Sequence, residues 1–198
     1  AEKRDKKYIL STKIRHNVLG NIMLAVSYRI DGLPIIINRI NDEVASIYKL
    51  IKNRDKTKDA YAFEMDSKLV HSLLVDVDSF IFELRSCCEL VEKLIKTISR
   101  HFKKHDVKEF VSELPSAEWS QCKWYTDLRK LRVEIFHHTA PYVDIDISNE
   151  PKYDLLFCTE NIQDYSKSTN FVRLSKIANI YKDFNSGILA LQKYIVNK

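Results

Sequence analysis

The strongest pattern in the sequence is a seven-residue repeat of apolar side chains in the middle of the chain. Five residues form the first series of this repeat: Val70, Val77, Leu84, Val91 and Ile98. A second series of apolar pairs falls between them, and neither glycine nor proline interrupts the stretch. The pattern predicts one long helix, from about residue 67 to 102, that packs against several neighbours in a bundle.

Shorter helical patterns precede this long helix. Apolar residues at helical spacing follow the capping residues Ser11 and Thr12 and predict a first helix that reaches Ile30. The sequence DGLP, residues 31–34, predicts a turn that breaks the chain, after which a second helix continues to Ile51. A solvated connection rich in lysine then leads to the long helix.

The last third of the chain predicts a further helix, a small β element and a final helix. A helix with a buried apolar stripe is predicted from Ser116 to about His138, because Pro141 restricts the residue before it to extended conformations. The alternating pattern and the turn residues within 142–158 predict a β-hairpin. Seven-residue periodicity returns over about 168–196 and predicts the last helix.

Together these elements predict an all-α fold: an up-and-down helical bundle with a small β-hairpin insert before its last helix. The chain has 198 residues, of which 45% are hydrophobic, and is long enough for one domain with its own core. It contains only three glycines and four prolines. This scarcity argues against an all-β sandwich, a dinucleotide-binding α/β fold and a P-loop enzyme, which need glycine at defined sites.

Charge and cysteine content indicate a compartment more clearly than an activity. The net charge of +5 permits a partner that carries phosphate groups without requiring one. Four cysteines, two of them adjacent at Cys87 and Cys88, fit neither a disulfide framework nor a paired zinc motif. No stretch approaches the ~20 uninterrupted apolar residues of a membrane span. We therefore expect a soluble, cytoplasmic protein with reduced thiols, the adjacent pair packed in the core, and no membrane association.

The most informative stretch for function lies at the end of the helix that Pro141 closes. Arg132 precedes His137 by five positions, and His138 follows directly. A guanidinium and an imidazole beside one phosphodiester can cleave RNA without a metal. The imidazole moves the proton of a ribose 2′-hydroxyl, and the guanidinium neutralises the charge that develops on phosphorus. The sequence thus indicates a site with no cofactor and no metal.

The spacing of this pair sets a geometric condition. Five residues advance about 140° around an α-helix, so an unbroken helix would not direct Arg132 and His137 at one phosphate. We therefore expect the last turn to unwind before Pro141, and a second subunit to complete the site across a twofold axis. His138 lies near the direction of the apolar stripe and fits a structural histidine, which leaves His137 as the better catalytic candidate.

The Arg132-x4-His137 spacing before a helix-stopping proline resembles the motif of the HEPN superfamily. Residues 76–94 resemble the helix that packs against the motif helix in one bacterial subgroup, and the resemblance in architecture covers about residues 66–196. It implies a single HEPN-like helical domain over residues 1–198. Members are commonly metal-independent endoribonucleases of toxin–antitoxin, abortive-infection and other defence systems. The resemblance thus implies an RNA substrate, a homodimer with a shared cleft and, in a toxin pair, an antitoxin protein.

The predicted site combines the helix that carries Arg132 with the long helix. The predicted catalytic residues are Arg132, His137 and His138, with Glu83 and Asp78 in support. Active members usually carry a polar residue directly after the motif arginine, where this chain has Val133. The alternative function is therefore a non-catalytic HEPN-like module that binds RNA or a protein. The spacing also fits a purely structural helix end, in which Arg132 pairs with an acid such as Glu83 or Asp127.

Overall fold

The computed structural model describes the fold in six segments of the chain. The backbone is described for residues 2–54, 67–101, 123–136, 141–147, 153–160 and 170–196. Side chains are described for residues 18–54, 67–97, 123–133, 141–147, 153–160 and 170–193.

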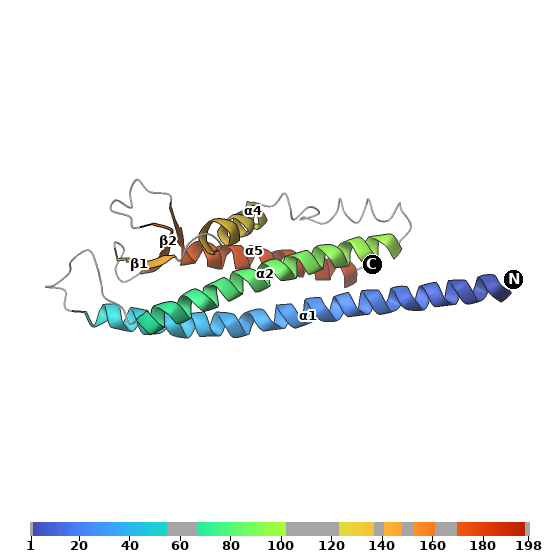
Figure 1. The fold of residues 1–198 in the computed structure, drawn as a ribbon, viewed down its shortest axis with the longest axis horizontal. Helices are drawn as coiled ribbons and strands as arrows, with labels where there is room; N and C mark the ends of the chain where they lie inside the picture. Colours follow the sequence, from blue (N-terminus) through green and yellow to red (C-terminus); the bar gives the residue numbers. More distant parts are fainter. Residues whose placement is uncertain are drawn as a thin grey trace.

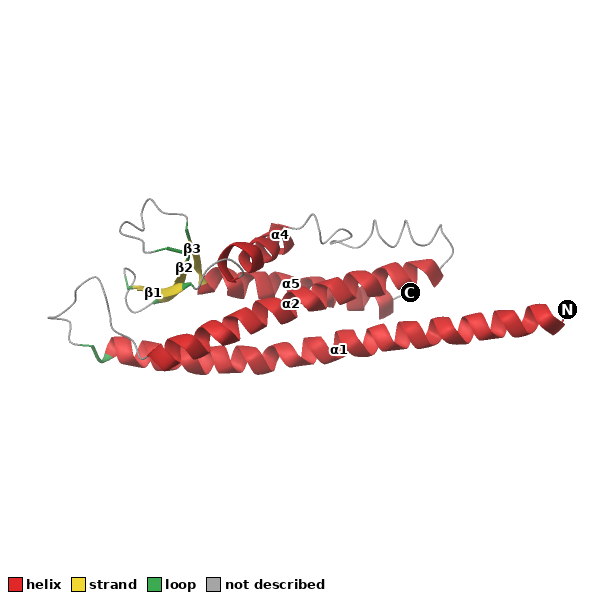
Figure 2. Ribbon diagram, in the orientation of Figure 1, coloured by secondary structure: helices red, strands yellow, loops and turns green. Residues whose placement is uncertain are grey.

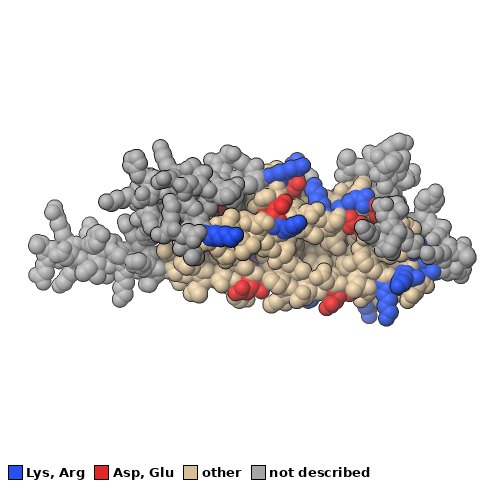
Figure 3. All heavy atoms as spheres, turned by 180° about the vertical axis from the view of Figure 1, so that it is seen from behind, with Lys and Arg blue, Asp and Glu red and all other residues tan. Residues whose placement is uncertain are grey.

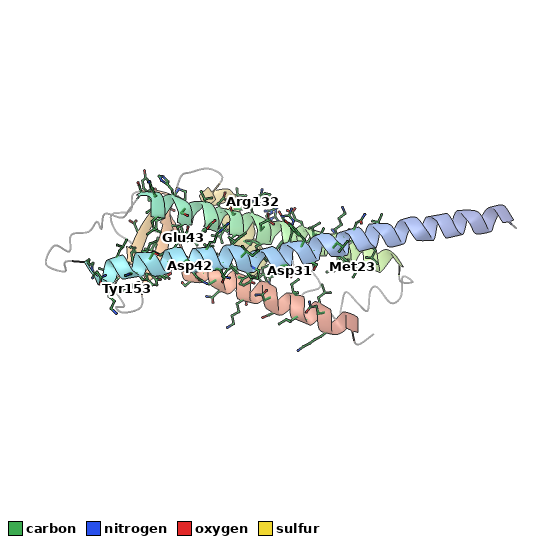
Figure 4. All side chains as sticks on the ribbon, turned by 90° about the horizontal axis from the view of Figure 1, so that it is seen from below. Met23, Asp31, Asp42, Glu43, Arg132 and Tyr153 are labelled. Atoms are coloured by element: carbon green, nitrogen blue, oxygen red, sulfur yellow. The ribbon has the colours of Figure 1, made fainter. Side chains whose placement is uncertain are left out.

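The helices form an elongated bundle (Figure 1). Helices α1 (Glu2–Lys52) and α2 (Ser67–His101) run antiparallel and side by side, and the amino-terminal part of α1 extends past the other helices. Helix α4 (Lys123–Lys130) continues directly into a π-helix, η3 (Leu131–Phe136). Helix α5 (Leu174–Val196) completes the bundle, with α2 and α5 between α1 on one side and α4 on the other (Figures 1 and 4).

A small antiparallel sheet lies at the end of the bundle where α1 ends and α5 begins (Figure 2). It consists of β1 (Tyr142–Asp146), β2 (Asp154–Cys158) and β3 (Phe171–Arg173), with β2 in the centre. Val143 faces Phe157 in the register of β1 and β2, so the inner residues of both strands point to one side. That side packs on the helical core, and the sheet thereby closes the end of the bundle.

Three predictions about these elements are confirmed. The fold is mostly helical with a small antiparallel sheet before the last helix, and the long helix covers Ser67–His101, close to the predicted 67–102. The hairpin predicted within 142–158 is present as β1 and β2, although its turn lies outside the described residues. The start of the helix predicted from Ser116 also lies outside them.

The turn predicted at residues 31–34 was wrong, because α1 continues through Pro34 without a break. Leu33 is only 1% exposed. It belongs to a series of apolar residues, spaced seven positions apart, that continues on both sides of the proline. This series comprises Val26, Leu33, Ile40 and Ile47. Packing of one continuous apolar face against α2 outweighs the hydrogen bond that the proline removes and its clash with the preceding turn.

The predicted start of the last helix at about residue 168 was also wrong. Residues 171–173 form strand β3, and α5 begins only at Leu174. Phe171 and Val172 favour strands, and their backbone pairs with that of β2. The amide of Thr159 donates to the carbonyl of Asn170 at 3.0 Å and extends this pairing.

One hydrophobic core joins all the described helices and the sheet. Its fully buried side chains come from α1, α2, α4, β2 and α5 and include Ile47, Leu84, Leu128, Phe157 and Phe184. An aromatic cluster links the helices within it, since the ring of Phe184 lies 6.2 Å from that of Trp124 and 6.3 Å from that of Tyr181. This core holds α4, and with it η3, against α5.

Polar side chains pair across the interface between α1 and α2. Arg29 forms an ion pair with Glu83, and the hydroxyl of Ser72 donates to Glu43. Arg39 donates to Asp76 at 2.7 Å. Asp76 is only 7% exposed, and it is the one buried charged residue in the described part of the chain. Along these pairs the partner on α2 moves from Glu83 back to Ser72 as the residue on α1 advances from Arg29 to Glu43, as an antiparallel arrangement requires.

The outer face of α1 is apolar and exposed. Leu24, Tyr28 and Ile35 are 71%, 82% and 63% exposed, and they lie on one stripe opposite the α2 interface. Within the described residues, one segment, Val18–Lys52, is long and apolar enough by length and composition to cross a membrane. Within this segment, Arg29 carries a charge and is paired with Glu83 of α2. The expected cytoplasmic location stays a prediction.

Candidate nucleic-acid site

The site lies at the end of α4, where this helix continues into η3 and η3 contacts α2. Leu128 and Leu131 are 1% and 3% exposed, and they fix this helix against the core. Arg132 follows directly and is half-buried at the edge of that contact. Figure 4 places Arg132 along α2, at the edge of the bundle away from α5.

The winding of the helix changes at this position. We expected the last turn to unwind before Pro141, and the segment Leu131–Phe136 is instead wound as a π-helix. In a π-helix the backbone hydrogen bonds run from residue i to i+5, and such turns are rare and frequent at functional sites. His137 and His138 lie outside the described residues, so Arg132 is the one predicted catalytic residue whose surroundings are known.

The contact that Arg132 makes is with an aromatic ring. Its guanidinium carbon lies 4.9 Å from the ring centroid of Phe82 in α2. A cation over an aromatic face is attracted by the quadrupole of the ring, which stabilises the contact by about 0.5–1 kcal/mol at exposed sites. No carboxylate pairs with Arg132 among the residues that the structure describes.

Glu83, predicted to support the site, pairs with a residue of α1 in the structure. Glu83 forms an ion pair with Arg29 of α1, and it lies about 100° around α2 from Phe82, so it faces the α1 interface. Asp127 does not neutralise Arg132 either, since its nearest cation is Lys176 of α5 at 3.7 Å. Asp78 is exposed on α2, one helical turn before Phe82, and therefore lies on the same side of the helix as the ring.

Further cations surround this contact. Arg129 is exposed one turn before Arg132, and Arg85 follows Phe82 by one turn on α2, where it bonds to Glu89 at 3.0 Å. Elsewhere basic and acidic side chains alternate: on the face seen in Figure 3, lysines and arginines are scattered among aspartates and glutamates. Local charge around Arg132, rather than the total of +5, is therefore the feature relevant to a phosphate.

Sequence reasoning missed Phe82. The signal was present, because Phe82 falls outside both apolar series of the long helix, whereas its neighbours Phe80 and Ile81 lie within them and are buried. A single exposed aromatic residue is not in itself informative, and Phe82 gains its interest from the guanidinium of Arg132 over its ring.

The adjacent thiols of Cys87 and Cys88 are buried in the core, as predicted. Burial raises the pKa of Cys87 to about 12 and raises the pKa of Cys88 well above its usual range. Both thiols are therefore neutral at pH 8, and we expect iodoacetamide to leave them unmodified in the folded protein and to alkylate them in denaturant. The mass of tryptic peptide 86–93, which contains both cysteines, shows whether they have been alkylated. Rapid alkylation of that peptide in the native protein would contradict the result.

No group of three or more histidine, cysteine or acidic side chains in the described part of the chain could hold a metal ion. No family model, curated protein or solved structure matches the chain. The fold defines the protein as a helical bundle with a small antiparallel sheet.

Proposed function

We propose that the protein is a metal-independent endoribonuclease of HEPN type. It works as a homodimer in a defence or toxin–antitoxin setting. In this proposal Arg132 binds the scissile phosphate and stabilises the transition state, while His137 is the general acid and base. His138 and Asp78 take supporting roles.

The proposal rests mainly on the surroundings of Arg132. Its guanidinium is half-buried, contacts an aromatic ring, and has no carboxylate partner among the described residues. A structural arginine at a helix end is usually neutralised by an acid, and the two acids suited to that role bind other cations. The charge of Arg132 is thus free of protein anions in the described region and suited to a phosphate.

The π-helical winding gives a second argument. Two residues five positions apart are separated by a smaller angle around the axis in a π-helix than in an α-helix, because each π-helical turn contains more residues. Arg132 and His137 are five apart. The winding of η3 therefore favours the convergence that the motif requires without complete unwinding of the helix.

The proposed reaction needs no other reagent. The imidazole of His137 takes the proton of the ribose 2′-hydroxyl, and the oxygen attacks phosphorus as the bond to the 5′-oxygen breaks. An imidazolium, from the second subunit or from His138, protonates the departing oxygen. The guanidinium of Arg132 neutralises the added negative charge on phosphorus. The products carry a 2′,3′-cyclic phosphate and a 5′-hydroxyl.

Cleavage of a single-stranded RNA in excess chelator tests the proposal. Arg132→Ala and His137→Ala are each expected to lower the cleavage rate by about 100-fold or more, since positioned acid–base and electrostatic groups contribute factors of this size. Lys182→Ala is the matched control, because Lys182 is an exposed cation on α5 outside the site. The end groups of the products are identified by mass spectrometry.

Three results would contradict this function. They are activity that disappears with chelator, full activity in both variants, and cleavage of DNA, which lacks the attacking hydroxyl. Sedimentation of the wild-type chain tests the dimer separately, since a monomer with full activity would exclude a shared cleft.

Val133 favours a second candidate, a module that binds RNA without cleaving it. This side chain is 46% exposed and apolar, and it offers no hydrogen bond directly after the motif arginine. The candidate predicts affinity for single-stranded RNA that falls steeply with salt, in a protein whose cleavage rate equals that of the His137→Ala variant.

A further inference from the structure

An exposed aromatic side chain lies beside the motif arginine. Phe82 is 44% exposed, and it is directed away from the buried neighbours Phe80 and Ile81 on the same helix. Its contribution to the core is correspondingly small. Its described polar contact is with the guanidinium of Arg132, 4.9 Å from the ring centroid.

The chemistry of this pair suits a nucleotide. Proteins bind unpaired bases by stacking them on aromatic rings or on guanidinium planes, and they bind the backbone with positive charge. Phe82 and Arg132 supply both from two different elements, and Arg129 adds an exposed cation one helical turn before Arg132. Arg85, one turn after Phe82, is paired with Glu89. Asp78, one helical turn before Phe82 on α2, is an exposed acid that disfavours a phosphate close to itself.

We propose that Phe82 is a base-stacking residue that makes the Arg132 site selective for single-stranded RNA, an inference that rests on the proposed function. A base and its phosphate are joined through a single ribose. The guanidinium of Arg132 covers one face of the ring, 4.9 Å from its centre, so a base next to a phosphate held by Arg132 would stack on the remaining exposed surface of Phe82. Bases in a duplex are already stacked and paired, so this ring contributes nothing to duplex binding.

The inference is tested by equilibrium binding of an RNA 12-mer that carries 2-aminopurine, whose fluorescence is quenched when it stacks. Phe82→Ala is expected to weaken single-strand binding about 5- to 150-fold, the range for one base stacked on an aromatic residue, and to restore the fluorescence. Phe82→Trp is expected to keep both affinity and quenching. Tyr28→Ala is the matched control, since it removes an aromatic ring that is 82% exposed on α1.

Salt dependence separates stacking from charge. Phe82→Ala should leave the slope of log K against log salt unchanged, whereas Arg132→Ala should reduce it by about one phosphate contact. A thermal unfolding curve of each variant checks that the fold is intact.

Each outcome has a defined meaning. Three results would overturn the stacking role, even if cleavage is observed. They are equal RNA affinity of the wild type and Phe82→Ala, an equal loss of affinity for duplex and single-stranded RNA in Phe82→Ala, and weaker binding by Phe82→Trp than by Phe82→Ala. Loss of stacking in Phe82→Ala in a protein that never cleaves RNA would support the stacking site and overturn the endoribonuclease instead.

Discussion

Replacing Phe184 by alanine is expected to lower the free energy of unfolding by about 3–5 kcal/mol, the usual range for removing a buried phenylalanine. The side chain is 0% exposed and lies at the centre of the aromatic cluster, with Trp124 of α4 and Tyr181 of α5 as ring neighbours. Truncation leaves a cavity between α4 and α5 that rigid neighbours cannot fill. Urea denaturation followed by far-ultraviolet circular dichroism measures the change.

The matched control for this prediction is Leu189→Ala on the same helix. Leu189 is 57% exposed, so its truncation should change the free energy of unfolding by less than about 0.5 kcal/mol. Equal effects of the two substitutions would show that α5 does not pack as described. Because α4 continues directly into η3, the Phe184 variant should also bind RNA less tightly than the control, even at temperatures where it stays folded.

Replacing Pro34 by alanine is expected to raise the free energy of unfolding by about 2 kcal/mol. A proline within a helix costs about 3 kcal/mol, because it lacks the amide that would bond to the carbonyl of Ile30 and its ring clashes with that turn. The gain is reduced by up to about 1 kcal/mol, since alanine gives the unfolded chain more freedom. Stabilising substitutions of this size are uncommon, so the sign alone is a strong test.

Gly32→Ala provides a companion measurement. An added Cβ at Gly32 meets nothing within 4 Å, so the substitution should stabilise the helix by about 0.5–1 kcal/mol. Destabilisation by Pro34→Ala would mean that the chain turns at residues 31–34 as the sequence had suggested, and that α1 is not continuous. Circular dichroism of both variants should show unchanged or slightly increased helicity.

How far the sequence predicts this fold depends on which signal dominates locally. The long helix was predicted almost to the residue, because its seven-residue repeat contains no competing turn residue. At residues 31–34 two signals conflicted. The local chemistry of Asp31, Gly32 and Pro34 favoured a turn, and the apolar series through Leu33 favoured a helix. Tertiary packing decided the outcome, and a comparison of apolar spacing on both sides of the proline would have revealed it.

Strand β3 could not be predicted for a different reason. It is only three residues long, and its existence depends on backbone pairing with β2, which is distant in sequence. At the site, the position of Arg132 at the end of a core helix followed from the apolar stripe before it. The partner of its guanidinium did not, because the sequence allowed an acid such as Glu83 or Asp127, whereas in the structure these acids pair with Arg29 and Lys176 and the guanidinium lies over Phe82.

The ion pair between Arg39 and Asp76 has a consequence for how the chain avoids misfolding. The apolar series of α1 repeats every seven residues, so sliding α1 along α2 by seven residues would superimpose one buried side chain on the next. The apolar surface alone therefore does not distinguish these alignments. Sliding in either direction would place Ser46 or Gly32, rather than Arg39, opposite Asp76. An unpaired carboxylate in that buried position is strongly unfavourable, so this charge, with the pair of Arg29 and Glu83, favours one alignment of the two longest helices.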